Sequence, residues 1–150
     1  MRCWPKGSAT GSRVLIVDTS AVFAALDRGE RRHTDVVAVA EHDDGPLYLS
    51  PFVLAELDYL VITRLGVRVE LDVLGQVAAG AWTLAPFDAI DVAAAIDVID
   101  RYADQKIGLA DASLLVLADR YHTDRILTLN RRHFDVLRQR DGRRFQVLPE

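Results

Sequence analysis

The sequence is poor in cysteine and in long hydrophobic runs, and both absences exclude classes of protein. Its one cysteine, Cys3, rules out a disulfide framework and favours a reducing compartment, by default the cytoplasm. Its apolar runs, such as LLVLA, are far shorter than the roughly 20 residues of a membrane-spanning helix. Because half of the 150 residues are hydrophobic and 27% are charged, we expect one soluble globular domain.

The first thirteen residues, MRCWPKGSATGSR, differ in composition from the rest. They lack the continuous apolar core of a signal peptide and are rich in Gly, Ser and Thr. We interpret residues 1–13 as a flexible extension or a tag, and residues 14–150 as the folded domain.

Positive charge is concentrated near the C-terminal end, although the net charge is −4. Residues 120–150 contain eight arginines and four acidic residues, whereas residues 1–119 contain ten basic and eighteen acidic residues. Arginine pairs bidentately with phosphate, so this end is compatible with binding a polyanion. A solvated surface with local ion pairs is the alternative, and charge alone favours it.

Short apolar runs alternate with helical patterns along the chain. The patterns predict strands at 14–17, 47–49, 82–84, 126–129 and 145–148, and helices at 19–26, 51–65, 70–79, 88–102 and 111–121. Ser50 and Pro51 are typical of a helix N-cap and first position. This alternation predicts a three-layer α/β fold, in which helices flank a central parallel sheet.

Four residues with oxygen-bearing side chains stand near the ends of these apolar runs. Asp18 follows VLIV, Glu56 lies in PFVLAELDYL, Asp111 in GLADASLLVLA, and Asn130 follows ILTL. In open parallel sheets, ligands bind beyond the carboxyl ends of the strands, where the strand order reverses. If the first and fourth strands are neighbours, one crevice holds Asp18, Asn130 and the first turn of the helix at Asp111. Glu56 would reach it from the helix after strand two.

Gathered carboxylates indicate a metal ion. Three of them repel one another, and a divalent cation relieves this repulsion. Oxygen ligands without Cys or His favour Mg²⁺, with Mn²⁺ as a plausible substitute, over zinc. Such an ion stabilises charge on a phosphoryl oxygen and lowers the pKa of bound water, so we predict metal-dependent phosphodiester hydrolysis.

Each acid also has a structural interpretation. Asp18 and Asp111 are both placed where they could cap a helix, a role that is compatible with metal binding. Glu56 stands in a nearly apolar helix, where a buried carboxylate needs either a metal or an ion pair with Arg64. For Asp104, capping a turn is favoured over a place as an outer ligand.

In order and spacing, these motifs resemble the PIN-domain ribonucleases. The segments DTSAVFAAL, PFVLAELDYLVITRLG, IGLADASLLVLADRY and ILTLNRRHF carry the resemblance, which covers about residues 14–148. It is closest to the VapC toxins of bacterial toxin–antitoxin pairs, especially the mycobacterial group. The resemblance implies a PIN-like fold and a metal-dependent endoribonuclease that cleaves structured RNA such as tRNA or rRNA. It also implies a homodimer that a cognate VapB antitoxin holds inactive.

The resemblance also implies roles for single residues. Asp18 and Asp111 match the principal Mg²⁺ ligands of the family, Glu56 matches its third acid, and Thr19 or Ser20 would help to order the site. Asn130 stands where the family usually has a fourth aspartate. Because an amide keeps an oxygen ligand but loses a charge, we expect reduced or more metal-demanding activity.

The residues that follow Asn130 are weak candidates for RNA contact. Arg131 and Arg132, with His133, would meet RNA phosphates beside the crevice, and a solvated surface is the alternative. Leu26 and Leu60 belong to the helices between Thr19 and Leu65, whose surplus of apolar residues predicts a groove for a partner helix.

Two other functions remain open. The first is a catalytically impaired PIN fold that binds RNA or protein without cleavage, because Asn130 replaces the usual aspartate. The second is a phosphatase of the haloacid dehalogenase type. We rank the phosphatase low, because its motif has a second aspartate where this sequence has Ser20.

Overall fold

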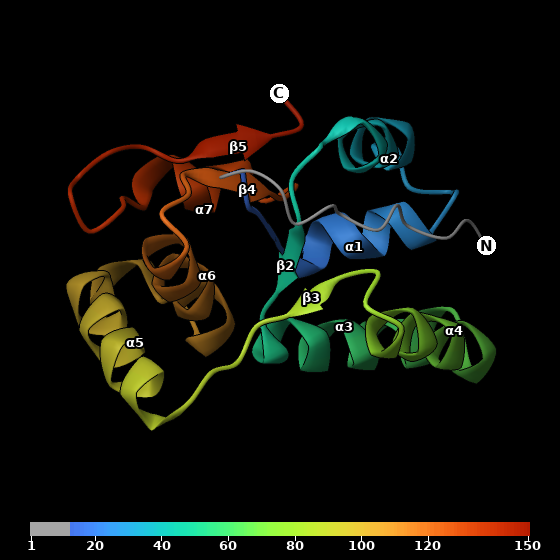
Figure 1. Cartoon of the computed structure of the whole chain (residues 1–150), viewed down its shortest axis with the longest axis horizontal. Coiled ribbons are helices and arrows are strands. Elements are labelled where there is room, and N and C mark those ends of the chain that lie inside the picture. Colours follow the sequence, from blue (N-terminus) through green and yellow to red (C-terminus); the bar gives the residue numbers. More distant parts are fainter. Residues whose placement is uncertain (1–12) are drawn as a thin grey trace.

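Five short parallel strands form one central sheet in the computed structural model, which describes residues 13–150. The strands are β1 (Leu15–Val17), β2 (Leu47–Leu49), β3 (Thr83–Leu84), β4 (Arg125–Leu127) and β5 (Gln146–Leu148). Their order is β3-β2-β1-β4-β5 (Figure 1). β1 and β4 are therefore neighbours, as the predicted crevice requires. The extension expected over residues 1–13 lies almost entirely outside the described residues.

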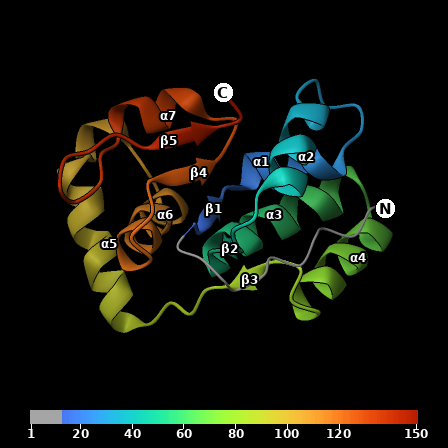
Figure 2. The ribbon, with the colours of Figure 1, turned by 45° about the horizontal axis from the view of Figure 1, so that its top comes forward.

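Helices cover the sheet on two sides. In the described part of the chain they are α1 (Thr19–Leu26), α2 (His33–His42), α3 (Pro51–Arg64), α4 (Val67–Ala78), α5 (Ala89–Arg101), α6 (Leu109–Arg120) and α7 (Arg131–Val136), with a 3₁₀ turn at Ala103–Gln105. Helices α1 to α4 lie to one side, and α5 and α6 to the other (Figure 2). The predicted three-layer α/β architecture is confirmed.

The predicted pattern missed α2 and α7. Helix α2 is rich in valine and lacks a side-chain cap at Arg32, so its sequence carries no clear helix start. Helix α7 has six residues, RRHFDV, and is too short to show a period. A single buried side chain, Phe134, holds α7 against the core. Tertiary packing, more than local preference, therefore makes both helices.

Three element boundaries differ from the prediction, and two of them change the position of a predicted site residue. Helix α6 begins at Leu109 and not at Asp111, so Asp111 lies inside its first turn. Strand β4 ends at Leu127, and Asn130 therefore stands at the start of α7 and not at a strand end. Helix α4 begins at Val67, directly after Gly66, whose φ of +90° reverses the chain tightly behind α3.

The core consists of the strands and the helix faces that pack on them. All three residues of β1 are fully buried, which explains its continuous apolar sequence. Trp82 and Phe134 are the largest of the fully buried side chains. Among the described residues, every helix is too short or too polar to span a bilayer.

Candidate active site

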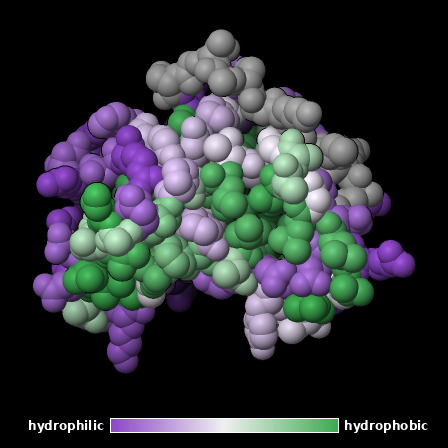
Figure 3. Space-filling view, turned by 60° about the horizontal axis from the view of Figure 1, so that its bottom comes forward, coloured by the Kyte–Doolittle hydropathy of each residue, from purple (hydrophilic) through white to green (hydrophobic). Residues whose placement is uncertain are grey.

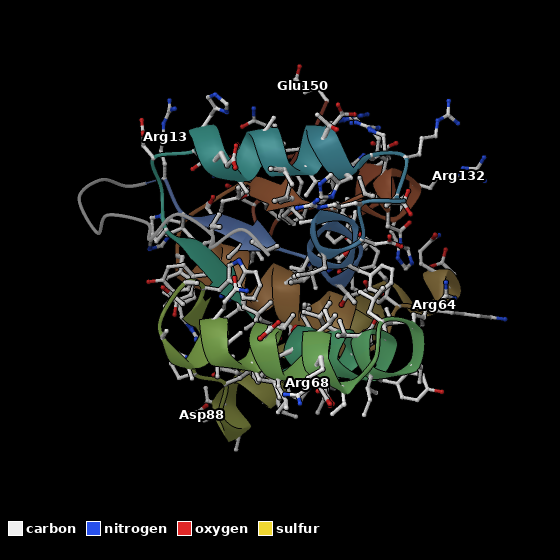
Figure 4. All side chains as sticks on the ribbon, turned by 90° about the vertical axis from the view of Figure 1, so that its right-hand side faces the viewer. Arg13, Arg64, Arg68, Asp88, Arg132 and Glu150 are labelled. Atoms are coloured by element: carbon white, nitrogen blue, oxygen red, sulfur yellow. The ribbon has the colours of Figure 1, made fainter. Side chains whose placement is uncertain are left out.

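The predicted site residues meet at the carboxyl edge of the sheet. Asp18 directly follows β1, Asn130 begins α7 after β4, Asp111 lies in the first turn of α6, and Glu56 lies in the second turn of α3. Figure 4 shows Arg13, which precedes β1, at one end of the molecule, and Arg64 and Arg132 at the opposite end. Arg64 and Arg132 therefore lie at the end of the molecule towards which β1 runs from Arg13 to Asp18.

Two hydroxyl groups hold the carboxylate of Asp18. Its Oδ2 accepts hydrogen bonds from Thr128 Oγ1 at 2.7 Å and from Ser20 Oγ at 2.9 Å. Backbone N–H groups fix the hydroxyls in turn, since Leu129 donates to Ser20 and Asn130 donates to Thr128, both at 3.0 Å. Oδ1 accepts no hydrogen bond from any described residue, so it is available to a ligand.

The capping interpretation of Asp18 is wrong, although the residue does occupy the N-cap position of α1. Its side chain makes no cap hydrogen bond, because both hydroxyls draw Oδ2 towards β4. Of the two residues expected to order the site, Ser20 does so. Thr19 is buried instead, and its hydroxyl has no partner among the described residues.

Thr128 is a site residue that the sequence interpretation missed. It is fully buried in a segment that is otherwise apolar, ILTL. A buried hydroxyl needs a hydrogen-bond partner, and this requirement was the available signal. Sequence alone does not say that the partner is Asp18, 110 positions away.

The three carboxylates share one electrostatic environment. Burial raises the pKa of Asp111; the nearby His133 opposes this rise, and the charge of Asp18 adds to it. Partial burial raises the pKa of Glu56, and the charges of Asp18 and Asp111 raise it further. Among the described residues, no arginine or lysine forms an ion pair with any of the three. The site therefore has an excess of negative charge.

The ion pair with Arg64, which was the structural alternative for Glu56, is absent from the described residues. Helix α3 buries one face only, through Val53, Leu57 and Val61, and Glu56 is exposed on another. Its apolar composition therefore misled the interpretation, because much of the helix surface is uncovered. Glu56 faces the other acids and needs no basic partner inside a core.

Two other acids keep structural roles. Asp111 is not the N-cap of α6, as the capping interpretation had it, but the third residue of the helix, where its carboxylate accepts a hydrogen bond from the backbone of Gly108, the N-cap residue. Asp104 lies exposed on the 3₁₀ turn, where its carboxylate accepts a hydrogen bond from the Gln105 side chain at 3.1 Å. The structural role favoured for Asp104 agrees with this geometry.

Asn130 and His133 form the fourth corner of the site. Nδ2 of Asn130 lies 3.0 Å from Nδ1 of His133, and that Nδ1 lies 3.6 Å from Oδ2 of Asp111. Asn130 stands at the N-cap of α7, but its side chain makes no cap hydrogen bond. His133 therefore points its Nδ1 edge into the site, whereas the sequence suggested a contact with RNA phosphates.

A buried chain of hydrogen bonds joins α3 to α6. Ser50 caps α3 as predicted, accepting from the N–H of Phe52 at 3.2 Å. Its hydroxyl lies 2.6 Å from that of Ser113, which donates to the carbonyl of Ala110 at 2.6 Å. The chain fixes the start of α3 against the first turn of α6, and so places Glu56 relative to Asp111. Ser113 was not predicted.

The donor set fits a hard divalent cation, because it consists of carboxylate oxygens that form no ion pair with an arginine or lysine of the described residues. In the range 13–150, no three side chains of His, Cys, Asp or Glu converge tightly enough to form a ready-made metal site. Mg²⁺ tolerates an open arrangement, since it retains several waters and commonly uses one or two carboxylates. The residues therefore fit a hydrated ion better than one that is fully enclosed.

Most of the C-terminal arginines serve the fold. Guanidinium groups bind within the protein in the pairs Arg120–Asp91, Arg125–Asp43, Arg131–Pro149 carbonyl, Arg138–Asp135 carbonyl and Arg143–Asp141. Arg132 and Arg144 have no such partner among the described residues. Local ion pairs and hydrogen bonds therefore account for much of the positive charge in this region.

Comparison with known proteins places this chain in a family. The sequence matches the PIN domain over residues 15–139. It is also 50% identical to Ribonuclease VapC26 of Mycobacterium tuberculosis over 135 residues, which are 90% of this chain and 100% of the relative. The chain therefore belongs to the PIN domain family and, within it, to the VapC ribonucleases.

Solved structures share the fold at low sequence identity. VapC20 of Mycobacterium tuberculosis, described as a sarcin-ricin loop cleaving toxin, gives a TM-score of 0.70 at 19% identity, covering 75% of this chain and 86% of that one. VapBC2 of Rickettsia felis, bound to a promoter DNA fragment, gives a TM-score of 0.64 at 16% identity, and the match covers 89% of this chain and 98% of that one. DNA-bound VapBC of Salmonella typhimurium gives a TM-score of 0.63 at 16% identity, and the match covers 90% of this chain and 98% of that one.

Proposed function

We propose that this protein is a divalent-metal-dependent endoribonuclease, the toxin of a VapBC pair, and that it cleaves structured RNA such as tRNA or rRNA. The observation that supports this proposal is the cluster of Asp18, Glu56 and Asp111 at the carboxyl edge of the sheet, with which no arginine or lysine of the described residues forms an ion pair. Its excess charge supports a bound cation, and family membership supports RNA as the substrate.

In this proposal Asp18, Asp111 and Glu56 hold Mg²⁺, for which Mn²⁺ can substitute. When bound, the ion supplies charge stabilisation at a phosphoryl oxygen and a lowered pKa for water. Asp18 presents Oδ1 because Ser20 and Thr128 occupy Oδ2.

Arg132 is the stronger of the two proposed RNA contacts. It is exposed, has no partner among the described residues, and lies at the edge that carries the acids (Figure 4). Arg131 donates to the carbonyl of Pro149 at 2.7 Å, so its guanidinium is already engaged. Arg64 lies at the same edge in Figure 4, and we propose that the RNA backbone passes between Arg132 and Arg64.

The partner proposals rest on apolar side chains left exposed. They include Tyr59 and Ile62 of α3, Val67, Leu71 and Leu74 of α4, and Ile90, Val92 and Ile96 of α5. Figure 3 shows hydrophobic surface spread over this underside of the molecule. Patches of this kind mark protein interfaces. We propose that one part binds a VapB-type antitoxin helix and another a second copy of the chain, in the cytoplasm.

Cleavage of RNA by purified protein tests the proposed function. We expect activity with Mg²⁺ or Mn²⁺, none with chelator, and a loss of at least a hundredfold in Asp18→Asn and in Asp111→Asn, since each removes a charge from the cation site. The Arg144→Ala variant is the matched control, because Arg144 is exposed and its guanidinium has no hydrogen-bond or ion-pair partner in the described part of the chain. Cleavage that persists in the aspartate variants would reveal a contaminating nuclease.

An impaired binding module is the second candidate function, favoured by Asn130 and by the open arrangement of the acids. The same assay separates the two candidates. If the wild-type protein binds RNA but does not cleave it, and Asn130→Asp restores cleavage, the binding module is correct. If the wild type cleaves and Asn130→Asp only lowers the metal requirement, the nuclease is correct.

A further inference from the structure

Tyr59 is the one exposed aromatic side chain in the described range 13–150. It is 69% exposed, whereas every other phenylalanine, tyrosine and tryptophan of this range is buried or half-buried. The ring contacts within the range involve other aromatic residues, and the Tyr59 hydroxyl forms no hydrogen bond with a described residue. Both its ring and its hydroxyl are therefore open to a ligand from outside the chain.

The position of Tyr59 on α3 is beside the candidate active site. It follows Glu56 by three residues, a spacing that makes the two side chains neighbours, about 4.5 Å apart along the helix axis. Long side chains of a helix lean towards its N-terminus, so Tyr59 leans over the turn that carries Glu56. Thr63, one turn further on, donates its hydroxyl back to the Tyr59 carbonyl at 2.7 Å. The exposed ring therefore borders the acids.

Tyr59 differs in place and in chemistry from the exposed aliphatic side chain nearest to it on α3, Ile62. Ile62 lies three residues further from Glu56 and about 120° from it around the helix axis. An aliphatic side chain offers apolar area alone, whereas an aromatic ring also offers a flat face on which a nucleobase stacks. Because Tyr59 is next to an acid of the proposed nuclease site, a base of the bound RNA is the ligand that fits it.

A basic side chain follows Tyr59 along the same helix. Arg64 is exposed, has no partner among the described residues, and lies about 7.5 Å beyond Tyr59 along the axis. Figure 4 shows Arg64 at the end of the molecule towards which β1 runs. Proteins that bind single-stranded nucleic acid combine basic groups for the backbone with aromatic rings for the bases. The surface of α3 has both, next to the acid cluster.

We infer that Tyr59 stacks on an unpaired base of the RNA substrate, beside the nucleotide whose phosphate meets the acids. The inference rests on the proposed function, because it concerns RNA bound at the same site. The stack holds the strand in place next to Glu56, while Arg64 contacts the backbone. A base inside a duplex has no free face, so this contact selects nucleotides that are already unstacked. Tyr59 binds the substrate and takes no part in the chemistry.

Fluorescence anisotropy with a labelled single-stranded RNA decamer of random sequence tests the inference, with chelator present to prevent cleavage. We expect Tyr59→Ala to weaken binding about tenfold, near the lower end of the contribution of one stacked base. Tyr59→Phe should bind as the wild type does, since it keeps the ring. Tyr59→Leu should lose most of the same affinity, because it keeps apolar area without a ring. A duplex RNA of equal length should bind all four proteins alike.

Cleavage of bulk tRNA with Mg²⁺ gives a second measurement. Tyr59→Ala should raise KM by a similar factor and retain most of kcat, because a stacked base is held equally before and during bond cleavage. Ile62→Ala is the matched control, since Ile62 is 42% exposed on the same helix. It should bind the decamer and cleave tRNA as the wild type does.

Two results would overturn the inference and leave the proposed function intact. The first is unchanged decamer affinity in Tyr59→Ala, with or without a loss of antitoxin binding, which would return Tyr59 to the proposed partner surface. The second is an equal loss in Tyr59→Ala and Ile62→Ala, which would assign the effect to apolar area and not to the ring. If the wild type neither binds nor cleaves RNA, the proposed function fails and the inference fails with it.

Discussion

The charge of Asp111 opposes folding when no metal is bound. Its side chain is only 24% exposed, and burial raises its pKa above the unfolded value of 3.8. The folded state therefore holds the proton more tightly than the unfolded state does. Stability falls as pH rises from about 3.8 through the folded pKa, and the full penalty remains at neutral pH. Asp111→Asn removes the charge and keeps the shape, so we expect the metal-free variant to be more stable at pH 7.

The expected gain is modest. Relief of an unfavourable charge commonly adds about 0.5–2 kcal/mol to the free energy of unfolding. His133 offsets part of the penalty in the wild type, so we place the gain near 1 kcal/mol, or about 2–4 °C in Tm for a chain of this length. Glu56→Gln should gain less, because Glu56 is exposed and water screens its charge.

Thermal unfolding followed by circular dichroism measures the charge penalty when chelator is present and the stabilisation by metal when Mn²⁺ is added. At pH 7 without metal, Asp111→Asn should melt at a higher temperature than the wild type. This difference in Tm should disappear near pH 3, where the Asp111 carboxyl of the wild type is protonated in both the folded and the unfolded state. With Mn²⁺ at about a hundred times its Kd, the wild type should gain about 2.7 kcal/mol and overtake the variant. An Asn variant that is less stable than the wild type at both pH values would show that Asp111 is chiefly a helix cap, and would refute the reasoning.

Two further predictions concern the support of Asp18 and the partner surface. Thr128→Val should lower the free energy of unfolding by about 1.5–3 kcal/mol and reduce RNA cleavage, because it removes a hydrogen bond to the charged Asp18. Thr128→Ser should retain stability and cleavage, since it keeps the hydroxyl. Calorimetry and the RNA assay measure the two quantities. Leu60→Lys should abolish co-purification with the cognate antitoxin and leave RNA cleavage unchanged. Lys106→Ala, at an exposed position, is the control and should behave as the wild type does. If Leu60→Lys co-purifies normally, the antitoxin does not bind in the groove predicted between residues 19 and 65.

Hydrophobic pattern was sufficient to predict the sheet and most of the helices. Strand β1 is a continuous apolar run because it is buried on both faces. The Ser-Pro start of α3 at residues 50 and 51 was predicted correctly because capping is a local property. Pattern failed at α7, whose six residues depend on the burial of Phe134. It also failed to show that much of α3 is uncovered, because composition does not say which face a helix buries.

The sequence predicts the candidate site only in part. Single residues could be identified from local pattern, whereas contacts between two distant residues could not. A carboxylate at the end of an apolar run is visible in sequence, and Asp18, Glu56 and Asp111 do come together. Their supporting groups are pairings between distant segments, such as Thr128 with Asp18, and no local pattern encodes them. Asn130 shows the consequence. Taken alone it is a lost charge that predicts weaker catalysis, but in the structure its amide nitrogen lies 3.0 Å from Nδ1 of His133, a contact that the sequence did not predict. A substitution at a ligand position should therefore be judged by the group that it contacts as well as by the charge that it removes.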